Sequence, residues 1–141
     1  MTDSQLLDLL ASQHRGVLVT LRRDGRPQLS NVDYSYDAAS RTIRVSTTAD
    51  RAKVRNLRRD PRASFHVSGT DGARFAVADG QAELSAIAAD PGDAAVEELI
   101  RLYRDVQGEH PDWADYRAAM VADRRLVLRV HVQRVYGYVG E

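Results

Sequence analysis

The sequence contains no cysteine and one lysine, Lys53, against nineteen arginines. The lack of cysteine excludes disulfides, thiolate nucleophiles and zinc–thiolate sites. No apolar run approaches the length of a membrane span, and the first residues lack the basic start and apolar stretch of a signal peptide. A chain of 141 residues is long enough to bury one substantial core. We therefore expect a single soluble, cytoplasmic domain over residues 1–141.

The composition also restricts the kinds of site. The four histidines, His14, His66, His110 and His131, lie far apart and show no metal-binding spacing, so no metal site is predicted. The formal net charge is zero. The molecule as a whole is therefore not a polyanion binder, and any anion site must be local.

Hydrophobic periodicity indicates a mainly β domain with peripheral helices. Alternating patterns and turn signals such as Asp24-Gly25 predict six strands, over residues 17–22, 27–36, 42–46, 63–68, 74–88 (interrupted at Gly80) and 126–139. Helical patterns cover residues 2–15, 51–60, 96–103 and 113–120. Short connections between most strands favour a small antiparallel barrel.

The densest basic segment runs from Arg51 to Arg62 and is predicted to be a short helix. Arginines at 51, 55, 58 and 59 share one stripe, where like charges cost about 0.2–0.5 kcal/mol per pair. Cations in the first turn also oppose the helix dipole by about 0.3–1 kcal/mol. An anion bound at the helix start would reverse both penalties. The hydroxyls of the preceding Ser46, Thr47 and Thr48 could add donors.

Lys53 falls off the arginine stripe, beside Leu57 and Val54, on the half of the helix expected to face the sheet. A lysine in that position is costly unless an anion meets it. Alternatively, the segment is a solvated charged face whose partners are Asp50 and Asp60. The residues alone leave a phosphate site and a solvated face open. They do not favour nucleic acid, because the patch is short and has no interleaved aromatic residues.

Four segments, residues 16–28, 30–32, 47–62 and 77–83, resemble the pyridoxamine 5'-phosphate oxidase-like split β-barrel superfamily. Within this superfamily, residues 51–62 carry the motif Arg-x-Lys-x-x-Asn-Leu-Arg-Arg-Asp-Pro-Arg. This motif most resembles the actinobacterial branch that uses the deazaflavin coenzyme F-420. The resemblance implies a six-stranded split β-barrel that forms a homodimer and binds its cofactor at the subunit interface.

The resemblance also implies ten cofactor-binding residues. Those expected at the phosphodiester are Arg51 and Lys53, helped by Ser46, Thr47 and Thr48. Those expected near the tail, or supporting that loop, are Arg55 and Asn56. Those expected along the ring system are Ser30, Asn31 and Val32.

The function implied is an oxidoreductase in which reduced F-420 gives a hydride to a conjugated, electron-poor molecule such as a quinone, an enone or biliverdin. Such chemistry requires no dedicated acid–base pair, and no catalytic side chain is predicted. An FMN-dependent enzyme resembling pyridoxamine-phosphate oxidase and a non-catalytic F-420 carrier remain as alternatives. The many basic groups favour F-420, whose glutamyl tail is polyanionic.

Candidates for a substrate pocket are five aromatic residues: Trp113, Tyr116, Tyr136, Tyr138 and His66. Trp113 and Tyr116 lie on an apolar helical stripe, which favours core packing. His66, like His131, lies within a predicted strand and can be a core or edge residue.

Overall fold

A computed structural model describes residues 2–140 and contains seven strands and four helices. The elements in chain order are α1 (Asp3–Ser12), β1 (Arg15–Leu21), β2 (Pro27–Asp33), β3 (Ser35–Asp37), β4 (Thr42–Thr48), α2 (Ala52–Arg59), β5 (Arg62–Ser68), β6 (Phe75–Leu84), α3 (Ala94–Gln107), α4 (Trp113–Ala122) and β7 (Arg125–Tyr138).

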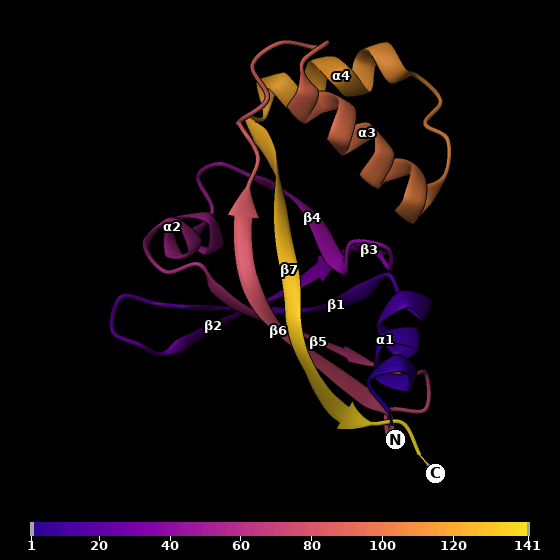
Figure 1. The fold of residues 1–141 in the computed structure, drawn as a ribbon. Helices are drawn as coiled ribbons and strands as arrows, with labels where there is room; N and C mark the ends of the chain where they lie inside the picture. Colours follow the sequence, from indigo (N-terminus) through magenta and orange to yellow (C-terminus); the bar gives the residue numbers. More distant parts are fainter. Residues whose placement is uncertain (1, 141) are drawn as a thin grey trace.

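The strands form one antiparallel sheet in the order β2-β1-β5-β6-β7-β4-β3, which curls into a half-barrel (Figure 1). The mainly β class with peripheral helices is confirmed. The predicted number of six strands is wrong, because the segment read as one strand over residues 27–36 forms both β2 and β3.

Tyr34 explains why that segment breaks in two. Its side chain is fully buried, packs edge-on against Phe65 with ring centroids 4.6 Å apart, and donates a hydrogen bond to the carbonyl of Leu10. Its backbone N–H is bonded to the carbonyl of His14. This anchoring turns the chain inward after β2. The strands on either side of Tyr34 therefore end at opposite edges of the sheet.

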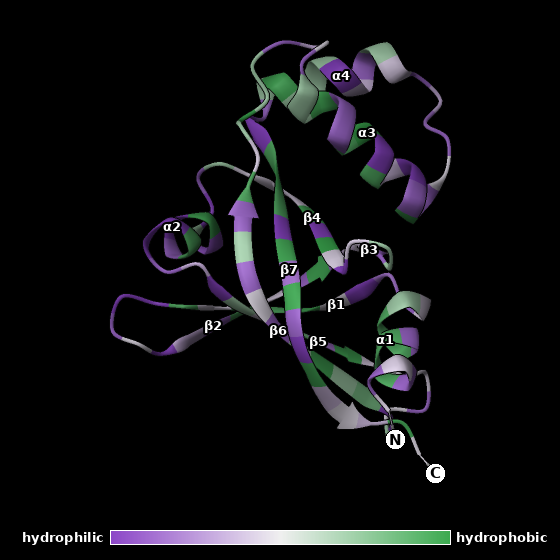
Figure 2. Cartoon of the chain, in the orientation of Figure 1, coloured by the Kyte–Doolittle hydropathy of each residue, from purple (hydrophilic) through white to green (hydrophobic). Residues whose placement is uncertain are grey.

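The main core lies inside the half-barrel and follows the alternation of the strands. Leu126, Leu128 and Val130 of β7 are fully buried, and each full burial of such a side chain stabilises the fold by about 1.5–3 kcal/mol. Figure 2 shows green, apolar bands separated by purple, polar ones along the middle of β7. Helix α1 adds leucines such as Leu6 and Leu10 to this core.

The helices α3 and α4 form a hairpin inserted between β6 and β7, beyond one end of the sheet (Figure 1). They share a second, smaller core that includes Leu99, Tyr116 and Met120, with Val127 as the contribution of β7. The strand expected over residues 74–88 ends at Leu84. No helix within residues 2–140 is long and apolar enough to cross a membrane.

Gly80 does not interrupt its strand, contrary to the prediction. The pairing passes from Asp79↔Arg134 to Gly80↔Val132, which leaves a bulge in the β6–β7 ladder. A Cβ at Gly80 would lie 2.2 Å from the carbonyl oxygen of His131. The glycine is therefore needed for close approach between the two backbones.

Candidate functional site

A cavity of about 590 Å³ lies where the ends of β2 and β4 meet the start of α2 and the α3–α4 hairpin. Ligand pockets are typically about 300–1,000 Å³. Its lining residues are Asn31, Val32, Asp33, Ser46, Thr47, Thr48, Arg51, Lys53, Leu102, Tyr103, Val106, Gln107, Tyr116, Met120, Asp123 and Arg125. Polar and basic residues come mostly from the strands and α2, and apolar ones mostly from the hairpin. We call these the polar wall and the apolar wall.

Seven of the ten residues expected to bind a cofactor line this cavity. The expected residues that line the cavity are Asn31, Val32, Ser46, Thr47, Thr48, Arg51 and Lys53. Strand β4 delivers the three hydroxyl residues at its end, and Arg51 is the N-cap residue of α2. The structure thus brings together segments of β2, β4 and α2 that are separate in the sequence.

Lys53 is half-buried on the polar wall, whereas the four arginines at 51, 55, 58 and 59 are exposed. The division of the helix inferred from the sequence is confirmed for Arg55, Arg58 and Arg59, whereas Arg51 lines the cavity together with Lys53. Burial lowers the pKa of Lys53, and the positive charge of Arg51 lowers that pKa further. Both effects disfavour the charged ammonium, and an anion beside it would oppose them.

The cavity lining holds three cations, Arg51, Lys53 and Arg125, and two carboxylates, Asp33 and Asp123. Within residues 2–140, neither Arg51, Lys53 nor Arg125 forms an ion pair with an Asp or Glu side chain. The start of α2 also has no side-chain cap. Unpaired cations beside free backbone N–H groups fit an anionic ligand such as a phosphodiester.

The hydroxyls at the end of β4 are already oriented. Thr48 Oγ1 donates to Asp50 Oδ1 at 2.8 Å, and Ser46 Oγ accepts from Arg125 Nη1 at 3.2 Å. Thr47 is buried. This network fixes the loop that joins β4 to α2.

Three of the expected residues, Ser30, Arg55 and Asn56, lie outside the cavity lining. Asn56 is buried, and its Nδ2 donates to Thr20 Oγ1 at 3.1 Å and to Gln28 Oε1 at 2.9 Å. These bonds tie α2 to the β1–β2 hairpin. Arg55 donates to the backbone carbonyl of Asp50, so it supports the loop that precedes the helix.

The apolar wall consists of Leu102, Tyr103 and Val106 from α3 with Tyr116 and Met120 from α4. Tyr116 combines the two roles considered for it, because it belongs to the hairpin core and also lines the cavity. Its hydroxyl donates to the Leu99 carbonyl at 3.0 Å, and burial raises its pKa to about 12.

The other aromatic candidates do not line this cavity. Trp113 packs edge-on against Tyr103, with ring centroids 5.7 Å apart. His66 stacks on Phe75 at 5.7 Å. Tyr136 and Tyr138 are 52% and 45% exposed on β7. Among residues 2–140 there is also no group of three or more side chains placed to hold a metal ion.

Sequence reasoning missed Arg125, which reaches the polar wall from the first position of β7. It lies opposite Thr48 in the β4–β7 pairing. Asp33 was also missed and is paired with Arg15 at 2.9 Å. No local motif marks Arg125, and only the register between two distant strands could have identified it.

Comparison with known proteins agrees with this architecture. A biliverdin reductase of Mycobacterium tuberculosis that depends on reduced coenzyme F-420 is 30% identical over 131 residues, covering 93% of this chain and 84% of the relative. A conserved hypothetical protein from the same species superposes with a TM-score of 0.74 at 26% identity, over 98% of this chain and 84% of that one. A structure described as an F-420 reductase superposes with a TM-score of 0.69 at 26% identity, over 92% of this chain and 94% of that one.

The family model described as pyridoxamine 5'-phosphate oxidase matches residues 2–138, almost the whole chain. The chain therefore belongs to the pyridoxamine 5'-phosphate oxidase family.

Proposed function

We propose that this protein is a reductase that uses coenzyme F-420 to reduce a conjugated, electron-poor small molecule. The observation that carries the proposal is the polar wall, where Arg51, Lys53 and Arg125 face a cavity with no carboxylate paired to any of them within residues 2–140. The relative and the neighbour whose names include F-420 support the choice of cofactor.

In this proposal, Arg51 and Lys53 hold the phosphodiester of F-420, with hydroxyl donors from the end of β4. Asn31 and Val32 lie along the ring system. Strand β2 is at an edge of the sheet, so backbone groups on its outer side are free to bind a ligand. Arg55 and the exposed arginines beyond it are placed outside the cavity, where a polyanionic tail would run.

The cofactor, when bound, supplies the hydride, and the protein supplies orientation and a shielded space. The apolar wall suits the second reactant. Tyr103, Tyr116 and Met120 offer flat or adaptable apolar surface to a conjugated molecule such as a quinone, an enone or a biliverdin-like tetrapyrrole. No side chain is assigned a catalytic role.

We further propose that the protein works as a cytoplasmic homodimer with the cofactor at the subunit interface. The edge strand β2 carries Leu29, which is 62% exposed, next to residues that line the cavity. The free edge of β2, with its unpaired backbone groups, and the exposed Leu29 together offer a surface that a second subunit can cover.

Titration of the purified protein with F-420 and separately with FMN, followed by cofactor fluorescence, tests the proposal. We expect saturable binding of F-420 in preference to FMN, and oxidation of reduced F-420 when menadione, an enone or biliverdin is added. Tight binding of FMN alone would instead support the FMN-dependent enzyme. Binding of F-420 without turnover of any of these acceptors would support the carrier.

A further inference from the structure

We propose that Glu98 is a positioning residue, which holds α3 against the sheet and thereby fixes the apolar wall that selects the substrate. The selection of substrate rests on the proposed function. The attachment of the helix does not, because it follows from contacts within the chain.

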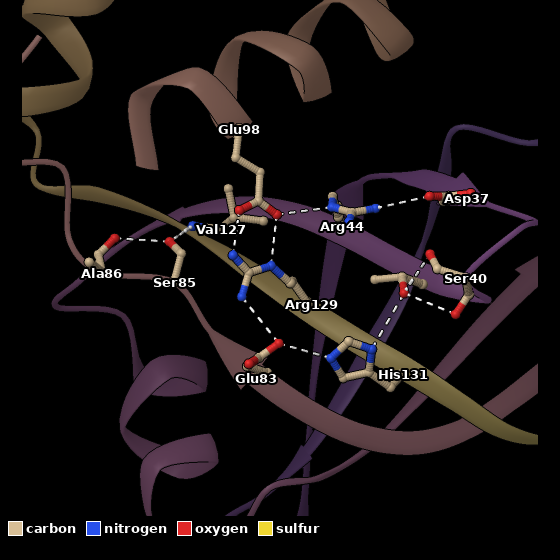
Figure 3. Close-up of polar contacts among 11 residues, drawn as sticks. Asp37, Ser40, Arg44, Glu83, Ser85, Ala86, Glu98, Val127, Arg129 and His131 are labelled. Carbon is tan, nitrogen blue, oxygen red and sulfur yellow. Dashed lines mark hydrogen bonds and ion pairs between the residues drawn. The ribbon is translucent and has the colours of Figure 1, made fainter. Parts of the chain in front are cut away.

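Glu98 is 7% exposed, and its carboxylate lies between two guanidinium groups (Figure 3). Oε2 accepts from Arg44 Nε at 2.9 Å and from Arg129 Nε at 2.7 Å, and Oε1 accepts from Arg129 Nη2. Burial would raise the pKa of Glu98, but hydrogen bonds from Arg129 and Arg44 hold it below its ordinary value. The carboxylate is therefore an ionised part of a buried cluster.

The two arginines come from neighbouring strands. Arg44 of β4 lies directly opposite Arg129 of β7 in the antiparallel ladder. Like charges directly opposite each other destabilise a sheet. Glu98, from α3, supplies the negative charge that allows both arginines to stand side by side. One helical side chain thus joins α3 to two strands at once.

A second group of side chains orients these arginines (Figure 3). Glu83 contacts Arg129 at 3.2 Å and His131 at 3.0 Å, and Asp37 lies 3.8 Å from Arg44. These contacts restrain Arg129 closely and Arg44 more weakly. The buried cluster is attached to the sheet, and its contacts with Glu98 set the position of α3.

The anchor lies one helical turn before the apolar wall. Leu102 follows Glu98 by four residues, so the two side chains lie on the same face of α3. Leu102 lines the main cavity and also a second cavity of about 420 Å³ between α3 and β3. With open space on both sides of Leu102, the placement of this part of α3 depends strongly on the Glu98 contacts.

Loss of the Glu98 charge would affect the two walls differently. Glu98→Gln removes the one carboxylate that both guanidiniums share, and Glu83 and Asp37 each contact only one of them, so α3 should move away from the sheet. The hairpin keeps its own core, and the polar wall is built on β4 and α2. Substrate recognition should therefore weaken while F-420 binding is retained.

The test compares the parent with Glu98→Gln, Glu98→Asp and a control, Glu97→Gln. Glu97 is the preceding residue and pairs with Arg117 at 2.6 Å, an ion pair between α3 and α4 that leaves the sheet contact intact. We would measure amide hydrogen exchange of residues 94–107, the dissociation constant for F-420, and KM and kcat with biliverdin.

In Glu98→Gln we expect exchange in α3 to accelerate by at least about tenfold relative to β5 and β6, as expected for loss of one member of a buried ion cluster. We expect KM for biliverdin to rise by about tenfold or more, with F-420 affinity within about threefold of the parent. Glu98→Asp, which keeps the charge, should lie between the parent and Glu98→Gln, and Glu97→Gln should match the parent.

Unchanged exchange in α3, or equal effects of Glu97→Gln and Glu98→Gln, would overturn the inference. So would an equal loss of affinity for F-420 and for biliverdin. If the parent itself does not bind F-420, the proposed function fails, and the exchange data alone still decide whether Glu98 anchors α3. If Glu98→Gln does not fold, the same comparison is made with Glu98→Asp.

Discussion

Burial and the neighbouring charge of Arg51 both lower the pKa of Lys53, and the two side chains line the same wall of the main cavity. Two cations placed so close repel each other, and neither is paired with a carboxylate within residues 2–140. Such an arrangement costs stability unless an anion joins it. The site therefore has a built-in preference for a negatively charged ligand, which leads to the first two predictions.

Lys53→Ala should weaken binding of F-420 by about 10- to 100-fold, because a charge-assisted hydrogen bond contributes about 1.5–3 kcal/mol. The matched control is Arg58→Ala, which removes an exposed cation from the same helix without altering the cavity lining. Fluorescence titration measures both affinities, and thermal unfolding reports any loss of fold. Equal affinities of Lys53→Ala and the parent would reject the role assigned to Lys53.

Binding of F-420 to the parent should weaken at alkaline pH, as Lys53 loses its proton. Burial and Arg51 lower its pKa, so this loss begins below the ordinary lysine value of 10.5. In Lys53→Arg the side chain stays charged over this range. Titrations at a series of pH values should therefore show a flatter alkaline dependence for Lys53→Arg. Parallel pH profiles for the two proteins would contradict the prediction.

Asn56→Ala should lower the free energy of unfolding by about 1–3 kcal/mol, because it leaves the buried hydroxyl of Thr20 and amide of Gln28 without their shared partner. Arg58→Ala, at an exposed position of the same helix, should change stability by less than about 0.5 kcal/mol. Urea unfolding followed by circular dichroism distinguishes the two. Similar stabilities for both variants would show that Asn56 does not hold α2 to the β1–β2 hairpin.

The stability difference between the parent and Glu98→Gln should depend on pH. The pKa of Glu98 is lower in the folded protein than its ordinary value of 4.5. Its ionised form therefore stabilises the fold fully above that value, and this contribution is lost as the pH falls through the folded-state pKa. We expect a difference of about 3 kcal/mol at neutral pH that shrinks in acid. A difference that stays constant down to acid unfolding would argue against an ionised Glu98.

Leu29→Arg should shift the protein from dimer toward monomer if β2 lies at the subunit interface. The substitution places a charge where an exposed apolar side chain now lies, and it leaves the cavity lining of one subunit intact. Sedimentation velocity over a range of concentrations measures the change. The control is Arg23→Ala in the exposed turn after β1. Identical sedimentation of Leu29→Arg and the parent would place the interface elsewhere.

Much of the sheet could be predicted from the sequence because its strands bury one face. The alternation of Leu126, Leu128 and Val130 fixes β7, and the Asp24-Gly25 turn fixes the β1–β2 hairpin. The break at Tyr34 could not be predicted. It depends on the bond to the Leu10 carbonyl, and that partner lies far away in the sequence.

The polar wall was predictable to a large extent, since Arg51 and Lys53 lie in one short segment with a recognisable pattern. On the apolar wall only Tyr116 was among the predicted residues. The helical stripe of Val96, Leu99 and Ile100 marks the face of α3 that packs in the hairpin core. Leu102 and Val106, which line the cavity, lie off that stripe, so their role depends on how the hairpin meets the sheet.

The position of β7 has a consequence for how the protein is made. This strand lies between β6 and β4, so Val127 must reach Ser46 before the two parts of the sheet are joined. Contacts between residues so distant along the chain form slowly. During synthesis, the polar wall stays incomplete until residues 125–138 leave the ribosome. A nascent chain that ends before β7 should therefore be unable to bind a phosphorylated ligand, although Arg51 and Lys53 have already been synthesised.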